Sequence, residues 1–529
     1  MHPFSFTDPF QSTLGYYNFS NIRYAAPPVG DLRWAAPQSP AQNRSVVQNG
    51  QDARICPQAY PGWYQTASQF VPEYLSGQRK FNDSAIFVPN NSVIPPQDPQ
   101  TNEDCLFLDV FVPEDVWAQR ASGKKVPVLF WIFGGGYTYG SKTSYGSPAG
   151  LLARSENNSM PGVIYVAPNY RLGAFGWLSG PTFQQDGGLA NAGLYDQRKA
   201  LEWVHENIHL FGGDADQITV FGQSAGGGSI VHQITAFGGN TEKSLFKRAI
   251  PQSPGFQVTI SQHQQQNTFL NFLKQASVSS LAQARALPYW QVQAANILTT
   301  AVAEYGTFTY GPVVDGVITP SIPGQLLARG QFDKNVSVMV GQNKDEGLSF
   351  TSPFLANDDA NSTRMRDDLL ISIPTLHGLP DQVDYIMNTL YPPIFDGSQA
   401  QGYTDQITRM AALSSEFAFI CNDFYLDKAL DNNTYAYLFD VFPATHGSDA
   451  PYTFYSPDSH IAAPAVAIEL QEYITAFAET GTPNEPGVPY FKSYANGSQV
   501  TVLAVNGIRD AADPAADQRC DYWQAGLWY

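Results

Sequence analysis

The sequence predicts an α/β fold in which a large, mostly parallel β-sheet is wrapped by helices. Five short apolar runs are rich in β-branched and aromatic residues, as expected of parallel strands that are buried on both faces. Helical patterns lie between these runs, and strands that alternate with helices indicate a wound sheet. The five runs are Val126–Phe133, Gly162–Ala167, Ile218–Phe221, Val336–Val340 and Tyr435–Val441.

The first of these runs ends in three consecutive glycines, Gly134, Gly135 and Gly136. One glycine is enough for a structural turn, so three after a buried strand favour a backbone that approaches a ligand closely. Backbone N–H groups of a loop in this position can form an oxyanion hole. We therefore expect this loop to stabilise a negative charge.

The helix before the third run carries H-E-x-x-H, a pattern typical of zinc proteases, at His205–His209. The apolar stripe of this helix consists of Leu201, Val204, Ile208 and Phe211. Both histidines lie at or beyond the edge of that stripe, and no third ligand follows at a suitable spacing. We interpret them as solvated surface residues, and we predict neither a metal nor any other cofactor.

The third run leads directly into Gly222-Gln223-Ser224-Ala225-Gly226, which fits G-x-S-x-G, the nucleophile elbow. Ser224 falls at the tip between the strand and a helix predicted over Ser229–Thr235, and small residues flank it so that the turn can close. The start of that helix directs a positive dipole at a developing oxyanion. This context predicts a nucleophilic serine.

The last two runs supply candidates for an acid and a base in the chain order Ser, acid, His. His446 follows Tyr435–Val441 and precedes a glycine, which places it on a loop at the end of a strand. The other late histidines, His377 and His460, are less well placed. The candidate acids are Asp345 and Glu346 after Val336–Val340, and Asp315 before them. Spacing does not separate these three carboxylates.

Two segments interrupt this pattern. Residues 56–105 are rich in Gly, Pro, Tyr and Gln and show little periodicity, so we expect a long surface excursion and a candidate lid. Ser261–Ile297 is helical in pattern and looks inserted into the sheet scaffold. Since no repeat or linker-like change of composition appears, we expect one domain over residues 1–529.

The charge balance excludes one class of partner. The chain has 529 residues, with 47 acidic and 29 basic side chains, and a formal net charge of −18. Such a surface repels phosphate backbones, so we expect no nucleic-acid partner. No run of about 18 apolar residues occurs, so we expect no transmembrane segment.

Cysteines and glycosylation sequons point to an oxidising compartment. The four cysteines, Cys56, Cys105, Cys421 and Cys520, suit two disulfides, for which spacing allows three pairings. Nine N-x-S/T sequons begin at Asn18, Asn43, Asn82, Asn90, Asn157, Asn335, Asn361, Asn432 and Asn496. Together they favour a secreted protein with N-linked glycans. The first residues lack the pattern of a signal peptide, which favours a mature form.

With these motifs in order, the chain resembles the type-B carboxylesterase/lipase family, which includes cholinesterases and fungal lipases. Matches span nearly the whole chain, and their number and order make the resemblance specific. They include IRYAAPPVGDLRW at Ile22–Trp34, NEDCLFLDVFVP at Asn102–Pro113, WIFGGGY at Trp131–Tyr137, NYRLGAFGWL at Asn169–Leu178, GLYDQRKALEWV at Gly193–Val204 and GTPN at Gly481–Asn484.

The resemblance implies an α/β-hydrolase fold and assigns roles to the motif residues. Ser224 would be the nucleophile, Glu346 the acid and His446 the base. The oxyanion donors would be the N–H groups of Gly135, Gly136 and Ala225. The resemblance also implies disulfides Cys56–Cys105 and Cys421–Cys520, and buried ion pairs Arg33–Glu103 and Arg171–Asp196.

The function implied is hydrolysis of a small-molecule or lipid ester through an acyl-enzyme. One alternative is a true triacylglycerol lipase with the Cys56–Cys105 excursion as its lid. An alternative of another class is a non-catalytic, adhesion-type member of the fold. Cholinesterases carry Glu before the nucleophile where this chain has Gln223, which argues against a cationic choline ester.

Overall fold

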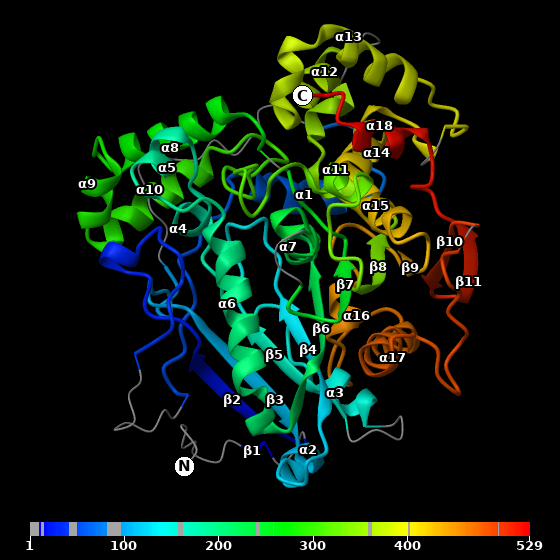
Figure 1. Cartoon of the computed structure of the whole chain (residues 1–529). Coiled ribbons are helices and arrows are strands. Elements are labelled where there is room, and N and C mark those ends of the chain that lie inside the picture. The colour runs from blue at the N-terminus through cyan, green and yellow to red at the C-terminus, as the bar shows by residue number, and fades with distance from the viewer. Residues whose placement is uncertain are drawn as a thin grey trace.

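A twisted β-sheet runs through the centre of the computed structural model, with helices on both faces (Figure 1). The structure describes residues 10–11, 15–41, 50–81, 97–156, 162–239, 244–257, 259–357, 362–399, 402–495 and 497–529. Within these residues the sheet has 11 strands in the order β1-β2-β3-β5-β4-β6-β7-β8-β9-β10-β11. This is the predicted α/β-hydrolase architecture.

The strands differ in direction between the middle and the ends of the sheet. The seven strands from β5 to β10 in this order are parallel, whereas β1, β2, β3 and β11 pair in antiparallel fashion. Their bounds are β1 Phe10–Gln11, β2 Tyr16–Arg23, β3 Phe107–Pro113, β4 Val126–Ile132, β5 Ile164–Pro168, β6 Gly213–Gln223, β7 Arg248–Gln252, β8 Ser337–Asn343, β9 Tyr435–Asp440, β10 Gln499–Ala504 and β11 Gly507–Ala512.

All five predicted strands lie in the parallel part of the sheet. Every residue of β4 is buried, because helices cover both of its faces, and this explains its unbroken apolar sequence. Since the carboxyl ends of parallel strands meet at one edge, the loops after β4, β6, β8 and β9 converge there.

Helices form two layers on this sheet. On one face α7 contacts β6 and β7, and α6 packs beside it; on the other face α17 contacts α3, β4 and β6 (Figure 1). The helices are α1 Trp63–Leu75, α2 Glu114–Gln119, α3 Ala149–Ser155, α4 Gly173–Trp177, α5 Pro181–Gln185, α6 Ala192–Asn207, α7 Ala225–Ile234, α8 Gln262–Gln275, α9 Leu281–Ala286, α10 Tyr289–Ala301, α11 Pro323–Ala328, α12 Thr363–Ser372, α13 Pro380–Tyr385, α14 Gln406–Ser415, α15 Cys421–Ala429, α16 Ala450–Thr453, α17 Pro464–Thr480 and α18 Gln518–Ala525.

Short helical turns complete the structure. They are η1 Gly30–Leu32, η3 Ile208–Phe211, η4 Ala236–Gly239, η5 Glu346–Phe350, η6 Pro353–Asn357, η7 Pro374–Gly378, η8 Ile386–Leu390 and η10 Glu416–Ile420. The predicted apolar stripe of α6 continues into η3, and all four of its residues are buried. The segment ends at Gly212, whose φ of 92° is a left-handed conformation that favours glycine.

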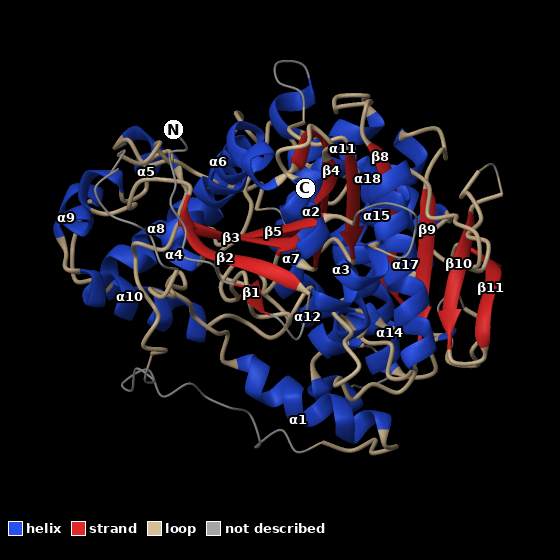
Figure 2. Ribbon diagram, turned by 90° about the horizontal axis from the view of Figure 1, so that it is seen from below, coloured by secondary structure: helices blue, strands red, loops and turns tan. Residues whose placement is uncertain are grey.

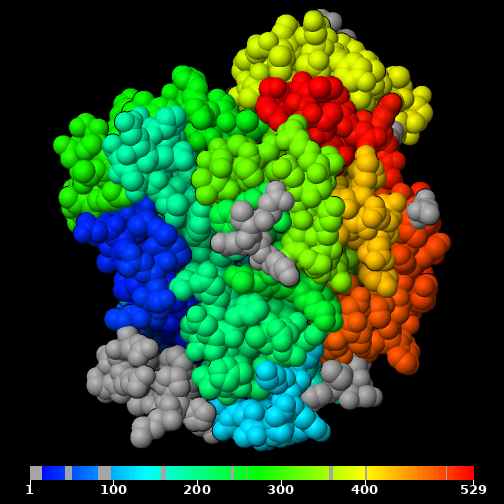
Figure 3. Space-filling view, in the orientation of Figure 1, coloured from blue at the N-terminus to red at the C-terminus, as the bar shows by residue number. Residues whose placement is uncertain are grey.

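Two helical groups rise above the carboxyl edge of the sheet (Figures 1 and 3). Seen from below, α8, α9 and α10 lie on the opposite side of the molecule from β10 and β11 (Figure 2). The predicted insertion is found as α8, α9 and α10. The second group, α12, α13 and α14, has no counterpart in the sequence-based prediction. The excursion between Cys56 and Cys105 carries α1, and its residues 82–96 lie outside the described part of the chain.

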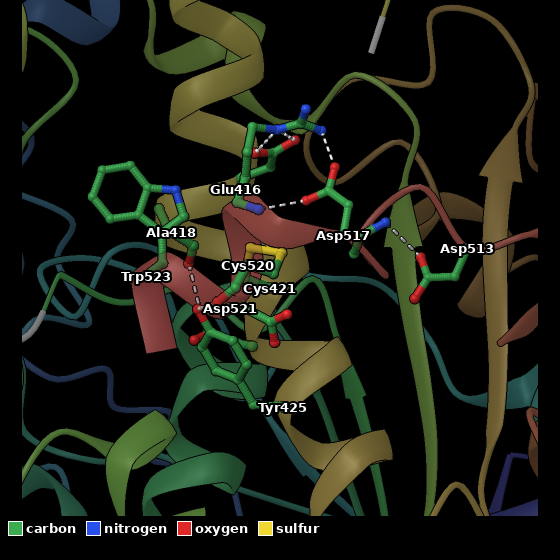
Figure 4. Close-up of a disulfide and its surroundings, with 12 residues drawn as sticks. Glu416, Ala418, Cys421, Tyr425, Asp513, Asp517, Cys520, Asp521 and Trp523 are labelled. Carbon is green, nitrogen blue, oxygen red and sulfur yellow. Dashed lines mark hydrogen bonds and ion pairs between the residues drawn. A yellow bond between two sulfur atoms is a disulfide. The ribbon is translucent and has the colours of Figure 1, made fainter. Parts of the chain in front are cut away.

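Both disulfides implied by the resemblance are present. Cys56 and Cys105 close a separation of 49 residues, and Cys421 and Cys520 close one of 99 residues. The second bond joins the start of α15 to α18, where Tyr425 donates its hydroxyl to the carbonyl of Cys520 at 3.1 Å (Figure 4). The C-terminal helix is thereby fixed to the layer that covers β8.

The two buried ion pairs are also found. Arg33 and Glu103 form a bidentate pair, as do Arg171 and Asp196, with both distances of the latter at 2.7 Å. Arginine suits such positions because its planar fork matches a carboxylate. Among the described residues, we find no helix with the length and apolar character that a bilayer crossing requires.

Candidate active site

Ser224 lies at a sharp turn between β6 and α7. Its φ of 58° and ψ of −125° are strained for a side chain other than glycine, and such strain is characteristic of functional turns. The flanking glycines are sterically required. A Cβ atom on Gly226 would lie 1.9 Å from the carbonyl oxygen of Ile132, and one on Gly222 would lie 2.5 Å from it.

Two further loops bring polar side chains to this turn. Nε2 of His446, on the loop after β9, lies 2.8 Å from Oγ of Ser224. Nδ1 of the same ring lies 2.5 Å from Oε2 of Glu346, in the turn after β8. The contact with the carboxylate places the proton on Nδ1, so Nε2 is free to accept the proton of the serine hydroxyl.

Glu346 is fully buried and well supplied with donors. Its Oε1 accepts hydrogen bonds from Ser253 Oγ at 2.6 Å, from the backbone N–H of Asn343 at 2.6 Å and from Asn343 Nδ2 at 3.2 Å. Charge-assisted bonds of this kind stabilise an ionised carboxylate and fix its direction. Ser253 and Asn343 carry no signal in the sequence, because only the fold brings them to the acid.

The other two candidate acids, Asp345 and Asp315, make their contacts in other parts of the structure. Asp345 is exposed, and its backbone N–H donates to the carbonyl of Ala444 at 2.9 Å. This bond joins the turn that bears Glu346 to the loop that bears His446. Asp315 accepts the N–H groups of its own loop, from Val317 at 2.8 Å and Thr319 at 3.0 Å. His377 and His460 are exposed and lie outside this cluster.

The glycine loop after β4 lies against the same turn. Gly135 and Gly136 have φ values of 112° and 56°, which favour glycine. A Cβ atom would meet the carbonyl oxygen of Tyr139 at 2.1 Å in the first case, and the ring of Phe308 at 2.0 Å in the second. Ala225 is the first residue of α7, so its N–H has no partner within the helix.

A cavity open to solvent reaches Ser224 and Gly136, and the empty space at this site, open solvent included, is about 750 Å³. None of the described side chains that line it carries a charge. Its aromatic walls are Tyr137, Phe256, Phe308, Tyr310, Phe350, Phe417 and Phe419. Two of these rings also pack on the imidazole of His446, with ring centroids at 5.1 Å for Phe350 and 4.4 Å for Phe419.

The unpredicted helical group contributes to this cavity. Ser372 at the end of α12 and Leu413 and Ser414 of α14 all line it. On the other side, Trp63 at the start of α1 packs against Phe308 and Phe350. α1, which belongs to the excursion between the first two cysteines, therefore packs behind two of the rings that line the cavity.

Gln223, immediately before Ser224, makes two contacts in the site. Its Nε2 lies 3.3 Å from Nε2 of His446, and its Oε1 accepts the hydroxyl proton of Tyr145 at 2.9 Å. Burial raises the pKa of Tyr145, so the phenol keeps its proton. The sequence drew attention to Gln223 but not to Tyr145.

A second group of carboxylates lies behind the site. Asp449 accepts hydrogen bonds from Tyr437 at 2.6 Å and from Asn343 at 3.1 Å, and burial raises its pKa. Burial, followed by the charge of Asp427, raises the pKa of Asp423 well above its usual value. Neither carboxylate oxygen of Asp423 has a hydrogen-bond partner among the described residues.

The two histidines of the H-E-x-x-H pattern lie far from this geometry. His205 is near the end of α6, where its Nε2 contacts the carbonyl of Leu245 at 2.9 Å, and His209 is in η3 beyond the helix. The part of the chain that the structure describes holds no group of three or more His, Cys, Asp or Glu side chains with the arrangement of a metal site.

Comparisons with known proteins agree with this picture. The sequence pattern of the carboxylesterase family matches residues 7–523. The chain is 39% identical to "Carboxylesterase patB" of Penicillium expansum, over 97% of this chain and 93% of that one. It is 30% identical to "Secreted triacylglycerol lipase LIP1" of Gibberella zeae, over 83% and 75% of the two chains.

Solved structures show the same fold. The crystal structure of Aspergillus niger EstA superposes with a TM-score of 0.79 at 25% identity, covering 99% of this chain and 96% of that one. A structure titled "PNB esterase" superposes with a TM-score of 0.72 at 25% identity and covers 97% of each chain.

Proposed function

The chain belongs to the carboxylesterase family and is a carboxylic ester hydrolase, and we propose that it acts through an acyl-enzyme on Ser224. The observation that carries the proposal is the continuous contact from Ser224 through His446 to Glu346. A nucleophile, a base and an orienting acid in this order are what acyl transfer requires. The contact also argues against the non-catalytic alternative.

In the first step, Oγ of Ser224 attacks the ester carbonyl carbon while Nε2 of His446 accepts the hydroxyl proton. Glu346 holds the imidazole in the required tautomer and balances the positive charge that develops on it. The tetrahedral intermediate then collapses. The bond to the alcohol oxygen breaks, His446 returns the proton to that oxygen, and the acyl group stays on Ser224.

In the second step, a water molecule takes the place of the alcohol. His446 removes a proton from the water, the oxygen attacks the acyl carbon, and the proton returns to Ser224 as the carboxylic acid leaves. Both steps develop negative charge on the same carbonyl oxygen. A single set of donors can therefore serve acylation and deacylation.

We assign those donors to the N–H groups of Gly135, Gly136 and Ala225. The positive φ values of the two glycines and the position of Ala225 at a helix start support this assignment. Loss of one oxyanion donor typically lowers kcat by about 10²–10³.

The uncharged lining of the cavity favours neutral esters, either small molecules or lipids. Among the lining side chains that the structure describes, an ammonium group would find no carboxylate to offset its desolvation. Kinetics on two esters that differ only in a quaternary nitrogen or a quaternary carbon test this point. We expect a higher kcat/KM for the carbon ester, and a preference for the cation would contradict the proposal.

We favour an esterase over an interfacial lipase because, among the described residues, the cavity that reaches Ser224 is already open to solvent. In this open arrangement α1 buries Trp63, Phe70 and Tyr74, whereas Gln65 and Glu73 face solvent. An ester can therefore approach the nucleophile without a movement of α1 at a lipid surface. Rates on short-chain and long-chain esters, measured below and above the solubility limit, separate the two: a jump in rate on emulsions would favour the lipase.

The central experiment compares wild type with Ser224→Ala on an ester panel that varies acyl length and aromatic character. We expect the variant to lose turnover and labelling by a fluorophosphonate probe. Ser68→Ala, an exposed position on α1, serves as the matched control and retains both. The proposal fails if Ser224→Ala keeps wild-type turnover, or if a chelator abolishes activity in a protein that the probe does not label.

We also propose that residues 1–529 form one domain and that the protein is secreted and N-glycosylated. The two disulfides and relatives named as secreted lipases support secretion. Among the described sequons, Asn335 is exposed, and Asn18 and Asn432 are half-buried. The sequons at Asn43, Asn82, Asn90, Asn157, Asn361 and Asn496 lie outside the described residues. A mass shift on treatment with an endoglycosidase tests this proposal.

A further inference from the structure

The amide of Gln223 faces the nitrogen that must accept the serine proton. Nδ1 of His446 donates to Glu346, so Nε2 is the unprotonated nitrogen of the resting ring. Two groups converge on it: Oγ of Ser224 at 2.8 Å and Nε2 of Gln223 at 3.3 Å. An amide nitrogen can only donate, so Gln223 competes for the lone pair that the reaction uses.

Tyr145 fixes which end of the amide faces the imidazole. Its hydroxyl donates to Oε1 of Gln223 at 2.9 Å, and the backbone N–H of Gly134 interacts with the phenol oxygen as a donor. The phenol proton is therefore left for Gln223. Because Oε1 is taken up in this way, Nε2 must point toward His446.

The ring of Tyr145 has little freedom to release this contact. It packs edge-on against Trp131, with ring centroids 5.2 Å apart, and it also contacts Phe454 at 6.3 Å. Gln223 itself is 2% exposed. Turning the amide would place its NH2 group, a donor, against the phenol proton and would break the bond that Oε1 now accepts, in a buried region with little water to replace it.

We propose that Gln223, oriented by Tyr145, donates its amide N–H to Nε2 of His446 and thereby extends ester hydrolysis to lower pH. A proton taken by Nε2 from solvent would face this N–H, and two donors directed at each other repel. Protonation of the base therefore costs more than it would beside an acceptor or a carboxylate. The inference rests on the proposed function, because it concerns the same base.

The charged groups around the imidazole of His446 in wild type are retained in the variants that test this proposal. Glu346 contacts Nδ1, and Asp449 lies three residues further along the same loop. Asp345 and Asp423 act on Glu346 from the neighbouring turn and from α15. The other ring contacts are the neutral Ser224, Phe350 and Phe419. Only the side chain at position 223 or its tyrosine partner is changed in the experiment.

The test is the midpoint of the acid limb of kcat/KM against pH on a neutral fluorogenic ester. In Gln223→Glu, a carboxylate replaces the donor about one contact distance from the ring, and we expect the midpoint to rise by about 1–2 pH units. Gln223→Leu removes the donor without adding a charge, and Tyr145→Phe frees the amide to turn. For each of these two we expect a rise of about half a pH unit.

Gln65→Glu, an exposed position on α1, is the matched control for the change in net charge and should leave the midpoint in place. Thermal unfolding and probe labelling check that each variant is folded. If Gln223→Glu does not fold, Gln223→Leu and Tyr145→Phe carry the test. Unchanged midpoints in the folded variants would overturn the inference, whereas an inactive wild type would overturn the proposed function instead.

Discussion

Replacing Gly136 by alanine tests the oxyanion loop directly. A Cβ atom at this position would lie 2.0 Å from the ring of Phe308, whereas ordinary contacts begin at 3.4 Å. The ring or the loop must therefore move by about 1.4 Å, the difference between these two distances. The φ of 56° adds about 1–2 kcal/mol of backbone strain for an L side chain.

The expected effect on catalysis follows from the displacement of the loop and from the backbone strain at position 136. A loop displaced by more than about 1 Å no longer directs its N–H at the oxyanion, so we expect kcat to fall by about 10²–10³ with a smaller change in KM. Removing the ring in Gly136→Ala/Phe308→Ala relieves the overlap but leaves the backbone strain. Relative to Phe308→Ala alone, the double variant should then lose only about 5- to 30-fold.

The assay is steady-state hydrolysis of a short-chain ester by the four proteins of this cycle. Gly123→Ala is the matched control, because Gly123 also has a positive φ, of 84°, but open space around it and no contact with the site. It should lose stability without losing kcat. A Gly136→Ala variant with wild-type kcat, or a double variant as impaired as Gly136→Ala, would refute the reasoning.

Three further predictions concern groups behind the site. Burial raises the pKa of Asp423 in the folded protein above its value in the unfolded chain, which is about 3.9. As pH rises between these two pKa values, the free energy of unfolding falls by up to about 1.4 kcal/mol per pH unit. Thermal melts should therefore show Asp423→Asn stabilised at pH 8 and unchanged near pH 4; equal effects at both would contradict this. Replacing Cys421 and Cys520 together by serine should lower the free energy of unfolding by about 2–5 kcal/mol in denaturant titrations, and an unchanged midpoint would show that the bond adds nothing. Ser253→Ala removes one donor from Glu346, so kcat should fall by about tenfold while KM holds; a wild-type kcat would mean that Asn343 alone positions the acid.

The central strands could be predicted because burial on both faces leaves an unbroken apolar run, as in β4. The outer and shorter strands leave no such run. β11, with the sequence GIRDAA, is largely exposed, and β7 is only five residues long and contains a proline. These strands belong to the sheet through their pairing with neighbours, which periodicity along one segment does not reveal.

The residues of the candidate site also differ in whether the sequence alone reveals them. Ser224 and the glycine loop are local motifs, so the sequence identified both. Spacing along the chain does not choose among the three candidate carboxylates, because the choice depends on how the turn after β8 meets the loop after β9. The resemblance to the family assigned Glu346. Ser253 and Tyr145 reach the site only through tertiary packing, and nothing near them in the sequence marks them.

The hydrogen bond from the Asp345 N–H to the carbonyl of Ala444 has a consequence for observing this enzyme. It spans the two loops that carry the acid and the base, so it persists only while both are docked. Amide hydrogen exchange at Asp345 therefore reports on the integrity of that pair from a single backbone position. The state of the catalytic apparatus can be followed in this way in the resting protein, with no ester present.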